Sequence, residues 1–210
     1  MERGRRDRNM ADKRDRIFRA ASDLFDEHGF ESVTTRQISD RADVAAGTLF
    51  RYASSKGELL LMIYNERFAA ALDEGIVVAE AASDVVDALL AVVEPILASA
   101  RTRPEDAAAY QRELIFGAPA ERYRAEGLEL VARTQTAIVD VLEREASRQG
   151  LDPSPTAARL AGRTAFAAVH LAVAAHAASA PTDSADDLRR QLRQIVDGYL
   201  IDPSHERNRQ

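Results

Sequence analysis

The chain has 210 residues, of which 46% are hydrophobic, and it contains no cysteine. This length and composition suffice for one large domain or a small domain joined to a larger one, and they exclude a disordered tail protein. The lack of cysteine excludes a disulfide framework, a thiolate metal site and a cysteine nucleophile. No stretch near the amino terminus is typical of an apolar signal segment, so we expect a cytoplasmic protein.

The formal net charge is -6, but the charges are distributed unevenly along the chain. Residues 1–57 carry 12 basic and 10 acidic side chains, whereas residues 58–210 carry 16 basic and 24 acidic ones. An acidic protein is a poor ligand for nucleic acid, because such binding depends on Lys and Arg neutralising phosphates. The uneven distribution therefore predicts two parts with different partners.

An uncharged run over residues 164–180 is rich in alanine. Its 17 residues fall short of the roughly 20 that a bilayer core requires, and it contains His170 and His176. Alanine also gains little free energy on transfer into lipid. We therefore expect neither a membrane span nor a membrane partner.

Apolar residues recur at helical spacing almost everywhere, which predicts an all-α fold of about nine helices. A first helix is expected from about Asp12 to His28, where Gly29 stops it. Before it, residues 1–11 are expected to form a basic flexible arm, either reaching into a minor groove or fraying as a solubilising tail. Four arginines make this arm basic: Arg3, Arg5, Arg6 and Arg8.

A second, short helix is expected to begin at Thr34 or Thr35 and to end near residue 42, because Thr34 and Gln37 fit a capping box. A third covers about residues 46–52. Ser55 and Glu58 form another capping box that opens a long fourth helix. Proline and glycine then mark later boundaries, with Pro95 interrupting a helix, Pro104 and Pro119 at helix starts, and breaks at Gly150 and Pro153. The remaining helices are expected over about 83–100, from 104, and over 119–149, 155–180 and 184–200.

Residues 33–60 have the spacing of a helix-turn-helix motif. Ile38 and Ala42 lie one turn apart on the second helix, Val44 fills the turn, and Leu49 points from the third helix into the same small core. Two helices joined by such a turn pack at an angle that pushes the second outward, where it can enter a major groove of DNA.

Two basic residues lie where helix dipoles disfavour them. Arg36 is in the first turn of the second helix and Lys56 in the first turn of the fourth, at a cost of up to about 1 kcal/mol each. A bound phosphate at these helix starts resolves the conflict. The alternative is two solvated basic residues placed there by chance.

The run TTRQISDRADVAAGTLFRYASSKGEL, residues 34–59, closely resembles the DNA-binding signature of TetR-type (TetR/AcrR) transcriptional regulators. The resemblance covers roughly residues 12–60. It implies that Thr35 and Lys56 contact phosphates and that Tyr52 lies against the sugar-phosphate backbone. It also implies a set of residues facing the major groove: Arg36, Ala46, Gly47, Thr48 and Arg51.

Three positions depart from this signature. Asp43 stands where a glycine is usual and must accept a left-handed conformation. Phe50 replaces a tyrosine and so lacks a hydroxyl that could bond phosphate, and Ala46 replaces a frequent polar residue. Base reading is therefore expected to depend on Arg36 and Arg51, since a bidentate arginine contact to guanine contributes about 1–3 kcal/mol of discrimination.

The resemblance implies a helix-turn-helix DNA-binding domain at 12–57, a larger helical ligand-binding and dimerisation domain at 58–202, and a flexible tail at 203–210. A single module with few base contacts binds too weakly, so we expect a homodimer on two half-sites about 34 Å apart. Residues 156–180 hold 12 alanines and allow close helix packing, although ordinary intramolecular core is the alternative. The expected interface residues are Ala161, Ala165, Ala168, Ala172, Leu188, Leu192, Ile195 and Tyr199.

A small-molecule effector requires an enclosed cavity with an apolar lining and a few polar groups among residues 58–180. Each candidate for such a site is also compatible with plain core or surface. These candidates are Phe68, Leu72, Tyr110, Arg112, Phe116, Tyr123, Gln135, Phe166 and His170. No metal or other cofactor is expected, because His170 and His176 do not share a helix face.

The sequence thus predicts an operator-binding repressor that a small molecule releases. The alternative is a constitutive DNA-binding regulator of the same fold without an effector pocket. An enzyme is not expected, because there is no glycine-rich phosphate loop, no triad spacing and no distinctive carboxylate pair. Residues 74–83, including Gly75, are expected to form the joint at the end of the fourth helix, through which the effector acts.

Overall fold

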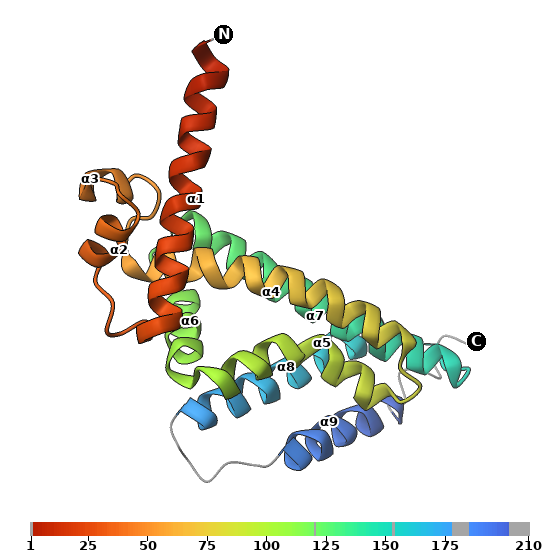
Figure 1. The fold of residues 1–210 in the computed structure, drawn as a ribbon. Coiled ribbons are helices and arrows are strands. Elements are labelled where there is room, and N and C mark those ends of the chain that lie inside the picture. Colours follow the sequence, from red (N-terminus) through yellow and green to blue (C-terminus); the bar gives the residue numbers. More distant parts are fainter. Residues whose placement is uncertain (1, 120, 153, 178–184, 202–210) are drawn as a thin grey trace. The chain divides into compact units, whose positions relative to one another are not determined.

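A computed structural model describes residues 2–119, 121–152, 154–177 and 185–201. All regular secondary structure in these ranges is helical, which confirms the expected all-α fold (Figure 1). In chain order the helices are α1 (Glu2–His28), α2 (Thr35–Arg41), α3 (Ala46–Leu49), α4 (Lys56–Ala81), α5 (Val85–Thr102), α6 (Pro104–Phe116), α7 (Arg122–Arg148), α8 (Pro155–Ala177) and α9 (Ala185–Leu200).

The described residues form two compact units, which do not coincide with the expected boundary after residue 57. Unit 1 lies within Met1–Arg67 and Glu105–Leu128, and unit 2 lies within Phe68–Pro104 and Glu129–Gln210. The chain therefore passes between the units three times: inside α4 after Arg67, at the start of α6 after Pro104, and inside α7 after Leu128. The expected tail, residues 203–210, lies outside the described residues.

The first helix begins at Glu2 rather than near Asp12, so the structure replaces the expected arm with helix. The added segment contains Glu, Arg, Met and Ala, all good helix formers, and a single glycine does not stop it. Figure 1 shows this amino-terminal part of α1 extending beyond α2 and α3. Gly29 ends the helix with a φ of 76°, as expected for a left-handed terminator.

The helix caps in the helix-turn-helix region follow the sequence closely. The capping box of α2 is present, because the Thr34 hydroxyl accepts from the Gln37 amide at 3.3 Å and Gln37 Oε1 accepts from the Thr34 amide at 2.8 Å. The third helix is shorter than expected. After Leu49 the chain tightens, with the amide of Tyr52 bonding to the Leu49 carbonyl three residues back.

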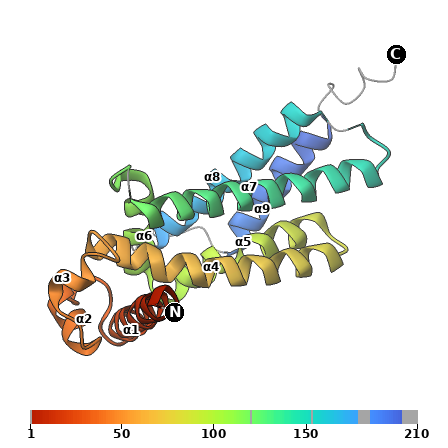
Figure 2. The same ribbon diagram turned by 90° about the horizontal axis from the view of Figure 1, so that it is seen from above.

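Unit 2 has a single apolar core to which α5, α8 and α9 all contribute. Figure 2 shows α8 and α9 running side by side, and both pack against α5. The α5 helix carries Pro95 inside it, as the sequence predicts. Fully buried side chains from the helices of this unit meet in the core, among them Leu89, Val92, Ile138, Leu142, Val169 and Leu192.

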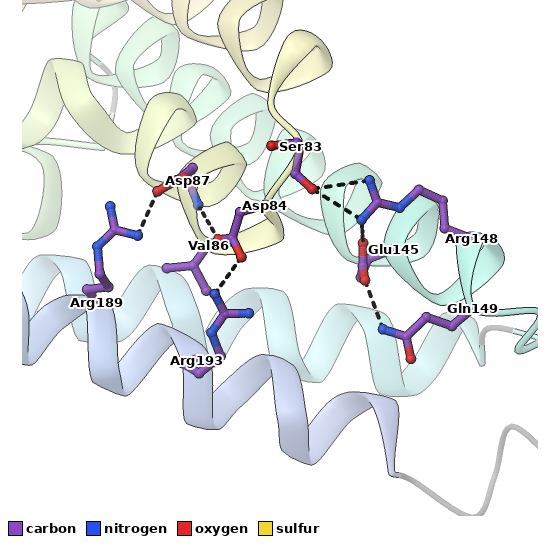
Figure 3. A network of polar contacts seen from close by, with 9 residues as sticks. All are labelled: Ser83, Asp84, Val86, Asp87, Glu145, Arg148, Gln149, Arg189 and Arg193. Carbon is purple, nitrogen blue, oxygen red and sulfur yellow. Dashed lines mark hydrogen bonds and ion pairs between the residues drawn. The ribbon is translucent and has the colours of Figure 1, made fainter.

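Asp84 links α9 to the start of α5 (Figure 3). Its carboxylate caps α5 by accepting from the backbone amides of Val86 at 2.9 Å and Asp87 at 3.1 Å. The same carboxylate accepts from Arg193 at 2.6 Å, and Arg189 pairs with Asp87 at 2.6 Å. The bond from Arg193, helped by the two amides, holds the pKa of Asp84 below its ordinary value.

A second group of polar contacts closes the turn between α4 and α5. Arg148 reaches the Ser83 carbonyl at 3.4 Å and pairs with Glu145 at 2.6 Å, and Gln149 donates to the other oxygen of Glu145 at 2.8 Å (Figure 3). These bonds tie the end of α7 to the turn.

The expected joint at residues 74–83 is mostly helix, because α4 continues to Ala81. A Cβ atom on Gly75 would lie 2.5 Å from the carbonyl oxygen of Ala91, so this glycine permits close packing of α4 against α5. Pro119 also differs from expectation, since it lies in a turn and α7 begins only at Arg122. None of the helices in the described ranges is both long and apolar enough to span a membrane.

Candidate nucleic-acid interface

The helix-turn-helix motif is held together by the small apolar core that its spacing predicts. Ile38 of α2 and Leu49 of α3 are fully buried, Ala42 is buried, and Val44 between the helices is half-buried. Asp43 takes a φ of 50°, the left-handed conformation expected in place of the usual glycine. The turn therefore keeps its shape without glycine.

Outside this core, α2 and α3 expose a basic face with small side chains. The side chain of Arg36 is 91% exposed and lies 3.9 Å from Asp40, too long for a strong ion pair. Arg51 is exposed and forms no ion pair with any described residue. Ala46 and Gly47 are also exposed, whereas Thr48 and Thr35 are half-buried.

Lys56 and Tyr52 bond within the protein. The Lys56 ammonium donates to the carbonyl of Phe30 at 2.9 Å and to that of Glu31 at 3.3 Å, and it lies 4.2 Å from the centre of the Phe30 ring. The hydroxyl of Tyr52 donates to the Met10 carbonyl on α1 at 3.2 Å. Both side chains thus hold parts of α1 and its following loop, a role that sequence reasoning missed.

Asp106 of α6 makes a buried contact to the loop that precedes α2. It is 2% exposed, and its carboxylate accepts from the Phe30 amide at 2.9 Å and from the Tyr64 hydroxyl at 3.1 Å. Burial and the nearby carboxylate raise the pKa of Tyr64, which stays a protonated donor. In the sequence Asp106 has only the appearance of an acid favoured in the first turn of a helix.

Glu58 is the second buried carboxylate of unit 1, at 5% exposure. Its backbone amide donates to the Ser55 hydroxyl at 2.9 Å, as a capping box requires. Its carboxylate, however, accepts from the backbone amide of Ser54 at 2.7 Å instead of from that of Ser55. The other carboxylate oxygen accepts from the Tyr123 amide at 3.3 Å, in the first turn of α7. One side chain therefore caps two helices.

The nine candidate effector residues fall into the two units. In unit 1, Tyr110 and Tyr123 are buried, with Tyr110 donating to Asn65 at 2.7 Å. Arg112 pairs with Glu31 at 3.2 Å, and Phe116 is 80% exposed, which is unlike a cavity lining. The others lie in unit 2: Phe68, Leu72, Gln135, Phe166 and His170.

Within unit 2, the rings of Phe166 and His170 lie 4.3 Å apart, and burial lowers the pKa of His170. Leu72 is buried, and Phe68 and Gln135 are half-buried. A separate surface pocket of about 120 Å³ lies beside the turn between α4 and α5 and includes none of the nine candidates. The described residues bring together no group of three or more His, Asp or Glu that could hold a metal ion.

Half of the expected interface residues belong to the core of unit 2. Ala165, Leu188, Leu192 and Tyr199 are buried within the single chain. This burial agrees with the alternative of ordinary intramolecular core. The other four are partly buried against the same core: Ala161, Ala168, Ala172 and Ile195.

The comparison with known protein families concerns the helix-turn-helix region. The sequence profile of the bacterial regulatory proteins of the tetR family matches residues 17–63, which include α2, α3 and the turn between them. Residues 17–63 therefore resemble the DNA-binding region of tetR-family regulators.

The chain is also similar to a known repressor over a short stretch. The transcriptional repressor KstR of Mycobacterium tuberculosis is 41% identical over 58 residues, which are 28% of this chain and 26% of KstR. The match thus spans about a quarter of that relative's length.

Solved structures extend the likeness to nearly the whole chain. The TetR-family repressor FadR of Thermus thermophilus, solved with lauroyl-CoA, has a TM-score of 0.66 at 24% identity, covering 89% of this chain and 93% of FadR. RolR, solved with resorcinol, has a TM-score of 0.62 at 15% identity, covering 96% of this chain and 94% of RolR. At these identities the likeness shows a shared fold.

Proposed function

We propose that this chain is a transcription repressor that binds operator DNA as a homodimer and leaves it when a small molecule occupies unit 2. The observation that carries the proposal is the exposed basic face of a helix-turn-helix motif, with Arg36 and Arg51 outside a core of Ile38 and Leu49. A protein that acts on the bacterial chromosome works in the cytoplasm.

Arg36 and Arg51 are proposed to read bases in the major groove, because a bidentate contact to guanine discriminates by about 1–3 kcal/mol. Ala46 and Gly47 are small and exposed, which lets the backbone of α3 approach the groove, and Thr48 completes this surface. Thr35, Tyr52 and Lys56 remain proposed backbone contacts. The Lys56 ammonium has three donors, of which two reach the carbonyls of Phe30 and Glu31.

Dimerisation is proposed to use the exposed face of α8. The residues of this face are spaced alternately by four and three positions, as in a helix that packs against a second helix. Leu160 and Leu171 are each 68% exposed, which is unusual for large apolar side chains on a free surface. The proposed face is Leu160, Thr164, Ala167, Leu171 and Ala174.

The effector is proposed to contact Phe166 and His170, with Leu72, Phe68 and Gln135 as further candidates in unit 2. Two of the unit 1 candidates bond within the protein, Tyr110 with Asn65 and Arg112 with Glu31, and are therefore less suitable. FadR was solved with lauroyl-CoA and RolR with resorcinol, two unlike compounds. The fold alone therefore does not select the chemistry of an effector.

The test is selection of tight-binding duplexes from a random pool, followed by titration of the selected duplex. Arg51→Ala is expected to weaken binding of that duplex about 10- to 100-fold, from the lost bidentate contact. Its affinity for unrelated DNA should change much less. Arg101→Ala removes the same charge from an exposed pair with Glu94 and is the matched control. If the wild type retards no duplex even at low salt, the proposal is wrong.

A panel of metabolites and drugs then tests the effector. A compound that binds the folded protein raises the melting temperature, and an effector should also lower affinity for the selected duplex. If the protein binds the selected duplex, but no compound raises its melting temperature or lowers that affinity, the protein is a constitutive regulator of the same fold.

A further inference from the structure

The chain crosses three times between unit 2 and unit 1, which contains the helix-turn-helix motif, and one crossing lies at the start of α6. That crossing lies between Pro104 and Glu105, and Asp106 follows directly. Asp106 is almost completely buried, so its two hydrogen bonds are shielded from water. A displacement of the chain at the crossing would act first on this carboxylate.

The partner of Asp106 is Phe30, a residue whose backbone amide and backbone carbonyl are both hydrogen-bonded to other side chains. The Phe30 amide donates to Asp106 at 2.9 Å, and the Phe30 carbonyl accepts from Lys56 at 2.9 Å. The Phe30 ring is itself buried and packs edge-on against Phe25 at 5.4 Å. Phe30 therefore fixes where the loop leaves α1, and Thr34 at the end of this loop caps α2.

The helix α6 has a second contact with this loop, but a much weaker one. Arg112 pairs with Glu31 at 3.2 Å, and both side chains are more than half exposed. Exposed ion pairs add little, because water and salt screen them, whereas a buried carboxylate that loses its donors is left without solvation. Of the two, Asp106 makes the contact able to transmit a displacement.

We propose that Asp106 is the positioning residue through which a change in unit 2 reaches the DNA-binding motif. When the start of α6 shifts, Asp106 withdraws from the Phe30 amide, and the loop that orients α2 loses its anchor. This inference rests on the proposed function, since it assigns the route by which an effector would release DNA.

The first test uses the free protein and Asp106→Asn, which keeps the size of the side chain but removes its charge. A hydrogen bond to a charged group is stronger than one to a neutral group, so exchange of the Phe30 amide should accelerate roughly tenfold or more. Glu31→Gln, which breaks only the exposed pair with Arg112, should leave that exchange unchanged. Hydrogen exchange resolved by mass spectrometry over residues 29–34 measures both.

The second test adds the duplex selected with the wild type. Because coupling is reciprocal, DNA bound at the motif should slow amide exchange in residues 105–116 of the wild type. At saturating duplex this slowing should disappear in Asp106→Asn and persist in Glu31→Gln. A merely structural role would lower the melting temperature of the variant but would not remove the response.

The outcomes separate the two proposals. If the wild type binds no duplex, the proposed function fails. If the wild type binds DNA and Asp106→Asn behaves like Glu31→Gln in both tests, the proposed function stands. Asp106 is then not the positioning residue that transmits a change in unit 2. If Asp106→Asn does not fold, Tyr64→Phe is the second variant. It removes one of the two hydrogen bonds to Asp106 and should partly reduce the slowing of amide exchange in residues 105–116 on DNA binding. A full response in Tyr64→Phe would then overturn the inference.

Discussion

At the scale of single residues, Gly47 gives a sharp distinction between folding and binding. Apart from its chain neighbours and its own helix backbone, a Cβ atom at Gly47 would meet nothing within 4 Å, and the φ of Gly47 does not lie in the left-handed region. The protein itself therefore does not need glycine at this position. Approach of the α3 backbone to DNA would explain it.

We expect Gly47→Ala to keep or raise the free energy of unfolding, by up to about 1 kcal/mol, while affinity for the selected duplex falls about tenfold. Gly75→Ala is the contrasting control, because the added methyl meets the Ala91 carbonyl and should destabilise the protein by about 1–3 kcal/mol. Urea unfolding and duplex titration measure the two quantities. Unchanged duplex affinity in Gly47→Ala would mean that this backbone stays away from DNA.

At the scale of helices, the link between α5 and α9 should respond to acid. The pKa of Asp84 is lowered mainly by Arg193, so the stabilisation is present above the ordinary range of about 4 and is lost as the pH falls through the lowered value. Between pH 6 and pH 2.5, the free energy of unfolding should therefore fall less in Arg193→Gln than in the wild type, because the variant has no Asp84–Arg193 pair to lose.

Urea unfolding at several pH values measures this difference. Arg190→Gln, which removes an exposed pair with Asp187 inside α9, is the control and should follow the wild type. If the free energy of unfolding depends on pH in the same way in Arg193→Gln and in the wild type, the Asp84–Arg193 pair makes no acid-sensitive contribution to stability.

The sequence predicts helices well where local chemistry decides them. The Thr34–Gln37 capping box, the left-handed Asp43 and the stops at Gly29 and Gly150 all depend on neighbouring residues, and the structure confirms each. The face of an alanine-rich helix is different. Alanines occur on every side of α8, so their spacing cannot tell which side packs inward.

The roles of the two buried carboxylates in the candidate site could not be predicted from the local sequence either. Asp106 looks like an ordinary acid in the first turn of a helix, and Glu58 looks only like the acid of a capping box with Ser55. Their partners, the amides of Phe30 and Tyr123, are 76 and 65 residues away in the chain. Only the tertiary fold brings these groups together.

At the scale of the whole molecule, the proposed dimer depends on the outer face of α8. We expect Leu171→Asp to shift the protein from dimer to monomer in analytical ultracentrifugation, because a charge would then have to be buried at the interface. Affinity for a two-half-site duplex should fall with it. Val77→Asp, at a similarly exposed valine of α4, is the control and should remain dimeric.

A Leu171→Asp protein that sediments like the wild type would exclude this face of α8 as the interface. If the wild type is itself monomeric at micromolar concentration, homodimerisation in the absence of DNA is excluded.

Unit 1 is discontinuous in sequence, and this limits how regulators can be recombined. Grafting only residues 1–57 onto another protein would separate the Phe30 amide from its buried acceptor and would remove Glu58 altogether. A functional chimaera would have to carry residues 105–128 from the same parent. Unit 1, with its proposed DNA-binding motif, is thus encoded by two stretches of the gene, not one.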